Sequence, residues 1–116
     1  MNQNDGKLLP RGVTEGDFRA EVLESTQPVL VEFWAPWSRA CQVLESVLEE
    51  LAASCGEKLK VVKVNADDSL DLSVCYDIQS LPTLLYFVGG KPQTRIVGTA
   101  SKDAILAKLE PFNAAT

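Results

Sequence analysis

The chain has 116 residues, 46% of them hydrophobic, and a formal net charge of −5 with a sequence pI near 4.6. This length supports one compact core and is too short for two ordinary domains. The basic residues are scattered along the sequence, so neither a nucleic acid nor an anionic membrane is expected as a partner.

Residues 1–13 are expected to form an N-terminal extension and residues 14–116 the domain. The sequence begins MNQNDGK and enters no long apolar run, so we expect neither a secretory signal nor a transmembrane helix. Cytoplasmic residence is the simplest interpretation. Leu8–Leu9 suggests a first strand, although Pro10 and Gly12 weaken that expectation.

A helix is predicted to start at Thr14, which has the character of an N-cap, and to end near Ser25. The apolar run 28–34 then predicts a central strand that is covered on both faces. Glu32 is the one carboxylate in this run, and its burial should raise its pKa.

From Ser38 the apolar period changes to that of a long helix, with Gly56 placed just after its end. Its apolar positions are Cys41, Leu44, Leu48, Leu51 and Cys55. Residues 59–65 predict the next strand, and Asp67 or Asp68 is expected to cap a short helix that ends near Tyr76.

Segments 84–88 and 94–97, joined by a Gly-Gly turn, predict a β-hairpin. Ser101 is expected to cap a last helix, and the apolar side of that helix should consist of Ala104, Ile105, Leu109 and Phe112. A βαβ half followed by a ββα half predicts an α/β fold with a mixed sheet and helices on both faces.

The chain has three cysteines and no histidine. Cys41, Cys55 and Cys75 are too few and too unevenly spaced for a disulfide scaffold, and no two of them have the close spacing of zinc ligands. The lack of histidine excludes Cys–His catalysis and imidazole metal ligands. We therefore expect no metal and no cofactor.

Residues 29–41 read VLVEFWAPWSRAC, and KVN, IQSLPT and VG follow at residues 63–65, 78–83 and 97–98. The ordered set resembles the thioredoxin family over roughly Thr14 to Phe112. The resemblance implies the thioredoxin fold and a function in thiol–disulfide exchange. It also implies protein disulfides as substrates and, for a parent with an intact motif, a thioredoxin reductase as reductant.

By this resemblance, Ser38 stands where the family has its attacking cysteine, and Cys41 is the resolving cysteine. Glu32 matches a buried proton acceptor, with Lys63 as its neighbour. A serine hydroxyl cannot form a mixed disulfide, so the motif SRAC lacks the group that starts the reaction. The remaining positions implied to bind substrate are Trp37, Arg39, Ala40, Leu81, the cis-proline position Pro82 and Gly98.

Structural explanations remain open for the same residues. Ser38 is also a good N-cap, Cys41 could simply pack in the core, and Glu32 and Lys63 could form an ion pair across neighbouring strands. Cys41 lies one turn into its helix on the apolar side, so its thiol is expected to be much less exposed than Ser38.

Three functional interpretations follow. The favoured one is a protein disulfide oxidoreductase in which an engineered exchange replaced the first cysteine by Ser38. The second is a naturally redox-silent module that binds a partner or assists folding. The third is a monothiol function through Cys41 or Cys75. In each case the chain is expected to be a monomer.

Overall fold

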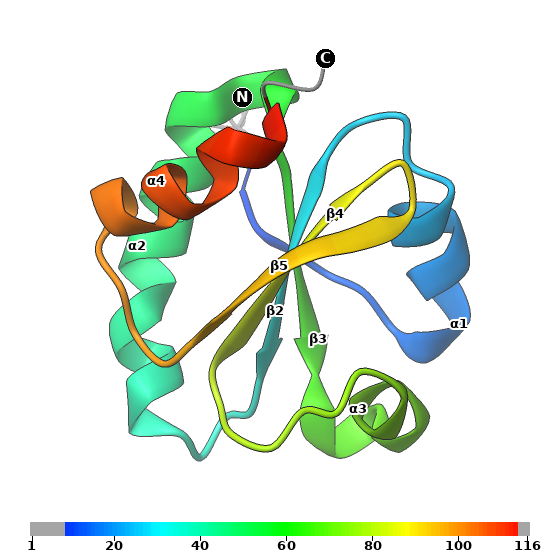
Figure 1. Ribbon diagram of the computed structural model, residues 1–116. Coiled ribbons are helices and arrows are strands. Elements are labelled where there is room, and N and C mark those ends of the chain that lie inside the picture. Colours follow the sequence, from blue (N-terminus) through cyan, green and yellow to red (C-terminus); the bar gives the residue numbers. More distant parts are fainter. Residues whose placement is uncertain (1–8, 114–116) are drawn as a thin grey trace, which may run out of the picture.

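A computed structural model describes residues 9–113, which form a five-stranded mixed sheet between two layers of helices (Figure 1). The strands stand in the order β1-β3-β2-β4-β5. The first three in this order are parallel, whereas β4 is antiparallel to both of its neighbours. Their bounds are β1 Arg11–Gly12, β2 Val29–Trp34, β3 Lys60–Asn65, β4 Thr83–Val88 and β5 Lys91–Val97.

Helices α2 and α4 cover one face of the sheet, and α1 and α3 cover the other (Figure 1). The helical segments are α1 Glu15–Phe18, a π-helix Arg19–Leu23, α2 Arg39–Cys55, the 3-10 helices Gly56–Lys58 and Ala66–Asp68, α3 Leu70–Cys75 and α4 Lys102–Asn113. This arrangement confirms the predicted α/β architecture. Among the described helices, none combines the length and the apolar character needed to cross a bilayer.

Strand β2 supplies side chains to two separate cores, because successive residues of a strand point to opposite faces. Val29, Val31 and Phe33 pack in the core beneath α1 and α3. Leu30 packs in the other core, with the leucines of α2 and with Ile105 of α4. Glu32 follows Leu30 by two residues, so its carboxyl group lies on the face that α2 covers.

The first strand was predicted at Leu8–Leu9, and Leu9 is not part of a strand. Leu8 is outside the described residues, and the strand is Arg11–Gly12, paired in parallel with Val62 and Lys63 of β3. Pro10 has no N–H to give to a ladder, so pairing starts after it. Residues 11 and 12 thus belong to the sheet, although they fall in the expected extension 1–13.

The first predicted helix forms, but it widens halfway. After Phe18 the backbone bonds change to the i→i−5 pattern, as in the bond from Glu24 N to Arg19 O at 2.9 Å. The apolar spacing in the sequence does not distinguish this pattern from an ordinary α-helix. Phe18 and Val22 are both buried against the sheet.

Neither Asp67 nor Asp68 caps α3, contrary to the sequence prediction. Asp67 and Asp68 form a separate 3-10 turn, in which the side chain of Asn65 accepts from Asp67 N at 2.9 Å. The helix itself starts after Ser69, and Glu15 of α1 accepts from Leu72 N at 3.1 Å. A carboxylate from another helix therefore stabilises this helix start.

The C-terminal half agrees with the prediction except at two points. Strand β5 begins at Lys91 and not at residue 94, because Pro92 is tolerated in an edge strand. Ser101 caps α4 as predicted, since its hydroxyl accepts from Ala104 N at 3.1 Å. Ala104 itself is exposed, so it does not contribute to the buried face of the helix.

The β4–β5 turn gives a matched test of backbone packing. Gly89 and Gly90 both have positive φ, but a Cβ on Gly90 would lie 2.4 Å from Leu23 O, whereas no described atom lies within 4 Å of one on Gly89. We predict that Gly89→Ala costs about 1 kcal/mol of unfolding free energy and that Gly90→Ala costs roughly 3 kcal/mol. Urea unfolding of both variants measures the difference, and equal costs would contradict the packing.

Candidate functional site

Ser38 lies at the N-terminus of α2, in the extended conformation of an N-cap residue. Its hydroxyl oxygen accepts a hydrogen bond from Cys41 N at 3.2 Å, and its carbonyl oxygen accepts from Gln42 N at 3.2 Å. The expected capping function of Ser38 is therefore confirmed. A group at this position lies close to the first N–H groups of α2, which have no acceptor within the helix, and to the positive end of the helix dipole.

The expected contrast in exposure between the two motif positions is wrong. Ser38 is 7% exposed and Cys41 is 4% exposed, so both side chains are buried. The Ser38 hydroxyl points back toward the first turn of α2, where it accepts the Cys41 N–H. The neighbouring Trp37, by contrast, is 69% exposed.

Beneath α2 lies a cavity of about 220 Å³ that we call the Glu32 cavity. Glu32 of β2, Cys41 of α2 and Lys63 of β3 all line it, so the fold brings together three of the predicted site residues. Glu32 is 1% exposed, and its Oε2 has no hydrogen-bond partner among residues 9–113. A small cavity that contains an unpaired carboxyl oxygen beside a thiol is a suitable place for proton transfer.

Lys63 is opposite Glu32 in the parallel register of β2 and β3, but it does not pair with it directly. Its Nζ lies 3.7 Å from Oε2 of Glu45 on α2 and 4.3 Å from the centre of the Trp34 ring. The cross-strand ion pair of Glu32 and Lys63, which the sequence left open as an alternative, is not among the ion pairs formed by residues 9–113. The Lys63 ammonium group is held between the helix carboxylate and the indole ring.

Burial raises the pKa of Glu32 from its ordinary value of 4.5 to about 7. The positive charge of Lys63 lowers this pKa and the negative charge of Glu45 raises it, but both effects are smaller than that of burial. The predicted direction of the shift is confirmed. A carboxyl group with a pKa near 7 can both accept and release a proton at neutral pH.

The Leu81–Pro82 peptide bond is cis, as the family resemblance implied. Pro82 lies just before β4, and its carbonyl oxygen accepts from Gly98 N at 2.9 Å. Thr83 and Val97 are paired in the ladder next to this bond. The predicted residues Leu81, Pro82 and Gly98 are therefore neighbours at one end of the β4–β5 hairpin.

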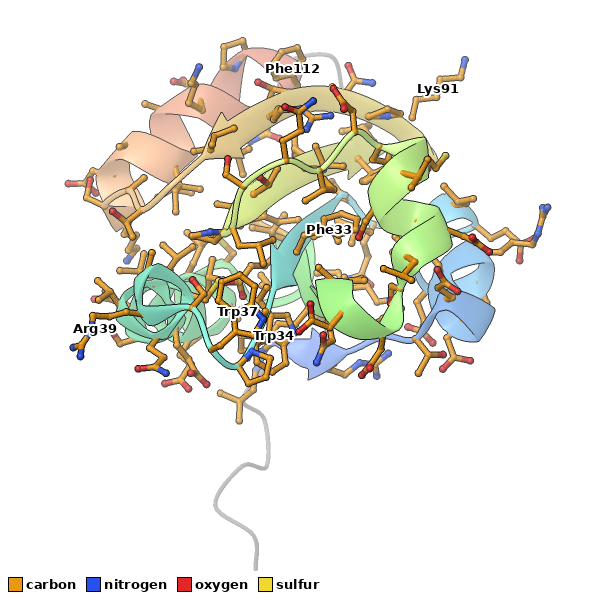
Figure 2. The ribbon with its side chains drawn as sticks, turned by 90° about the horizontal axis from the view of Figure 1, so that it is seen from below. Phe33, Trp34, Trp37, Arg39, Lys91 and Phe112 are labelled. Atoms are coloured by element: carbon orange, nitrogen blue, oxygen red, sulfur yellow. The ribbon has the colours of Figure 1, made fainter. Side chains whose placement is uncertain are left out.

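Trp37 is held above a second hollow, of about 260 Å³, that we call the Trp37 cleft. Its indole Nε1 donates to Asp67 Oδ2 at 2.8 Å, and Leu81 and Ile78 line the same cleft. Because Trp37 adjoins Ser38 and Leu81 adjoins Pro82, the cleft brings the helix start and the cis-proline loop together. Arg39 projects away from Trp37 toward solvent (Figure 2).

Two residues of the site were not predicted from the sequence. Glu45 follows Cys41 by four residues and so lies on the same side of α2, a spacing that could have indicated it. Asp67 was interpreted as a helix cap, and nothing in its local sequence points to the Trp37 indole thirty residues away. Ala40 is half-buried and lines neither hollow.

Comparison with known sequences agrees with this geometry. The family model described as Thioredoxin matches residues 10–111, which is most of the chain. The chain belongs to the thioredoxin family. Members of the family are thiol–disulfide oxidoreductases that act on protein disulfides and are reduced by thioredoxin reductase.

Several thioredoxins are similar to this chain along most of its length. Thioredoxin 1 of Nostoc sp. is 43% identical over 98 residues, which cover 84% of this chain and 92% of that protein. The chloroplastic M-type thioredoxin of Chlamydomonas reinhardtii is 41% identical over 100 residues, which cover 86% and 71%. A bifunctional thioredoxin reductase/thioredoxin of Mycobacterium leprae is 41% identical over 84% of this chain, in a region that makes up 21% of that protein.

The raised pKa of Glu32 predicts a specific dependence of stability on pH. Below pH 4.5 the Glu32 carboxyl group is protonated in both the folded and the unfolded chain. Between 4.5 and about 7 only the folded chain holds the proton, so stability falls as the pH rises, by about 3 kcal/mol in total. We predict that Glu32→Gln removes this loss, so its unfolding free energy relative to the parent rises by that amount between about pH 4 and pH 8.

Urea unfolding of the parent and the variant across this pH range measures the effect. Glu49→Gln is the matched control, because Glu49 lies on α2 with an exposed carboxylate. A fall in stability that Glu49→Gln removed as fully as Glu32→Gln would show that the effect does not come from the buried carboxyl group. A constant difference for Glu32→Gln would show that Glu32 does not titrate in the way described.

Proposed function

We propose that this chain is a protein disulfide oxidoreductase whose exchange reaction is blocked because Ser38 replaces the attacking cysteine. The observation that carries the proposal is the position of the Ser38 hydroxyl, at the N-terminus of α2 and one helical turn from Cys41. The family has its attacking sulfur at this position. The replacement is further proposed to be engineered, since serine is the near-isosteric exchange that silences a thiol.

In a parent with cysteine at position 38, the reaction would proceed in two exchanges. The thiolate at position 38 attacks a substrate disulfide, forms a mixed disulfide and releases one substrate thiolate. Cys41 then loses its proton and attacks the mixed disulfide, which releases the second substrate thiolate and leaves a disulfide between positions 38 and 41. Two electrons have passed to the substrate, and a reductase returns them.

Glu32 is proposed to accept the proton of Cys41 in the second exchange. Both residues line the Glu32 cavity, and with a pKa near 7 Glu32 can accept a proton at neutral pH. Lys63 is proposed to limit the pKa of Glu32, because its charge favours the carboxylate form. Cys41 lies one helical turn from position 38, where a resolving thiol can reach a mixed disulfide formed at that position.

The Trp37 cleft is proposed to hold the extended segment of the substrate that carries the disulfide. Leu81 and Trp37 offer apolar surface there, and the exposed Trp37 ring is fixed in place by Asp67. Pro82 and Gly98 would shape the backbone at this end of the hairpin, with Arg39 and Ala40 at the start of α2. We further propose a monomeric, cytoplasmic protein with one domain, which takes in β1 as well as the predicted residues 14–116.

A second candidate is a redox-silent module that binds a partner through the same cleft. The Trp37 cleft favours it, because its lining contains no sulfur and does not depend on the residue at position 38. A monothiol function would instead depend on Cys75, which is exposed, whereas Cys41 is buried. The codon for position 38 in the source gene separates the first two candidates, because a natural cysteine codon would end the redox-silent one.

The proposal predicts that Ser38→Cys restores disulfide reduction. We expect the variant to accelerate the reduction of insulin by dithiothreitol by roughly tenfold or more over the parent chain, because a thiolate is then present at the helix N-terminus. Precipitation of the insulin B chain measures the rate. The double variant Ser38→Cys/Cys41→Ser is the matched control, since it attacks but does not resolve.

The control should form a stable mixed disulfide with a substrate and show little turnover. If Ser38→Cys folds, as judged by circular dichroism, and still gives no more turnover than the parent, the oxidoreductase proposal is wrong. The redox-silent module would then be the better account of the Trp37 cleft.

A further inference from the structure

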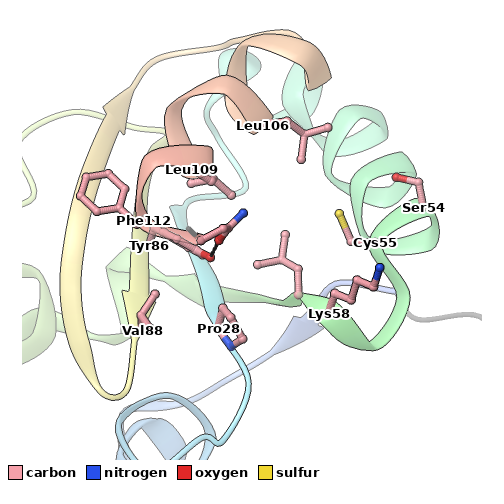
Figure 3. Close-up of a pocket in the computed structure, with 11 residues that line it drawn as sticks. Pro28, Ser54, Cys55, Lys58, Tyr86, Val88, Leu106, Leu109 and Phe112 are labelled. Carbon is pink, nitrogen blue, oxygen red and sulfur yellow. Dashed lines mark hydrogen bonds between the residues drawn. The ribbon is translucent and has the colours of Figure 1, made fainter. Parts of the chain in front are cut away.

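A further cavity in the described part of the chain lies at the opposite end of α2 from Ser38. It measures about 530 Å³ and lies between the C-terminal ends of α2 and α4 (Figure 3). The seventeen residues of α2 separate it from the Ser38 end by about 25 Å. It is therefore distinct from both the Glu32 cavity and the Trp37 cleft.

The inner walls of this C-terminal cavity are mainly apolar. Its floor and sides consist of Leu59, Tyr86, Val88, Leu106, Leu109 and Phe112. The hydroxyl group of Tyr86 is not available to a ligand as a donor, because it donates to Asn113 Oδ1 (Figure 3). Both the volume and the apolar lining are typical of sites that bind small molecules.

One charged side chain lines the cavity, and it is a cation. Lys58 lies on the α2 side of the cavity, across the hollow from Tyr86 and Phe112, and its ammonium end is drawn toward Cys55 (Figure 3). None of the ion pairs formed among residues 9–113 includes Lys58. Its ammonium group is exposed at the edge of an apolar cavity, which is the arrangement that complements an anionic group on an apolar body.

We propose that the C-terminal cavity binds a small anionic amphiphile, such as a medium-chain carboxylate. The hydrocarbon chain occupies the space between α2 and α4, and the carboxylate lies at the opening beside Lys58. The site does not depend on the residue at position 38 or on the proposed redox function. Cys55 lines the cavity, so a bound chain covers its thiol.

The labelling rates of two cysteines can be used to detect binding in the C-terminal cavity. Cys55 lines the cavity and is half-buried, whereas Cys75 is exposed on α3 and lines no part of it. We expect decanoate, below its micelle concentration, to slow the labelling of Cys55 by N-ethylmaleimide severalfold and to leave the labelling of Cys75 unchanged. Mass spectrometry of peptides after timed labelling measures both rates in the full chain.

Two lysine variants test the position of the carboxylate. Lys58→Gln should raise the decanoate concentration needed for half-protection of Cys55 by about twofold to fivefold, which is the range expected for one exposed ion pair. Lys108→Gln makes the same change of charge on α4, at a residue that does not line the cavity, and should have no effect. The neutral 1-decanol should protect Cys55 equally in the parent and in both variants.

Three results would overturn the proposal. The first is no slowing of Cys55 labelling by decanoate, and the second is equal slowing at Cys55 and Cys75, which indicates a nonspecific effect. The third is protection that rises with protein concentration and needs no decanoate, because a second copy of the chain would then cover the cavity. None of these results bears on the Ser38→Cys test, so the two proposals fail independently.

Discussion

The free N–H groups at the start of α2 are the constraint on which the candidate site depends. In this chain the Ser38 hydroxyl satisfies one of them by accepting from Cys41 N. The same bonding that stabilises a helix start also stabilises a negative charge placed there, which is why a thiol at this position becomes a reactive thiolate. The Ser38 hydroxyl caps the helix as described, but it cannot act as the attacking sulfur.

The interior beneath that helix start is costly to fold, because it encloses a carboxyl group that we propose takes part in proton transfer. Glu32 is enclosed with one carboxyl oxygen unpartnered among the described residues, and burial raises its pKa to about 7. Lys63 is near enough to lower this pKa but is held by Glu45 and Trp34, so it does not neutralise Glu32 by direct contact. The chain therefore tolerates a destabilising group next to the Cys41 thiol.

Local patterns in the sequence predicted most of the fold, because the strands, the long helix and the hairpin each carry a clear apolar period or turn signal. The motif also placed Ser38 at the helix start and a cis bond before Pro82, but it did not predict that Ser38 and Cys41 are both buried. The features that sequence reasoning missed depend on contacts between residues that are far apart in the sequence. The partner of Lys63 is on a helix and not on the next strand, Asp67 binds an indole and not a helix end, and the first strand starts only after Pro10.

The thiol pKa of the Ser38→Cys/Cys41→Ser variant tests the central claim most directly, because it measures the stabilisation of an anion at the start of α2. Thiolate absorbance near 240 nm, taken as the difference from a Cys41→Ser variant across a pH titration, isolates the introduced thiol from Cys55 and Cys75. The account predicts a pKa clearly below the ordinary value of about 8.5, at roughly 7.5 or less. A pKa at or above about 8.5 would contradict it, since the helix start would then give a sulfur anion no help.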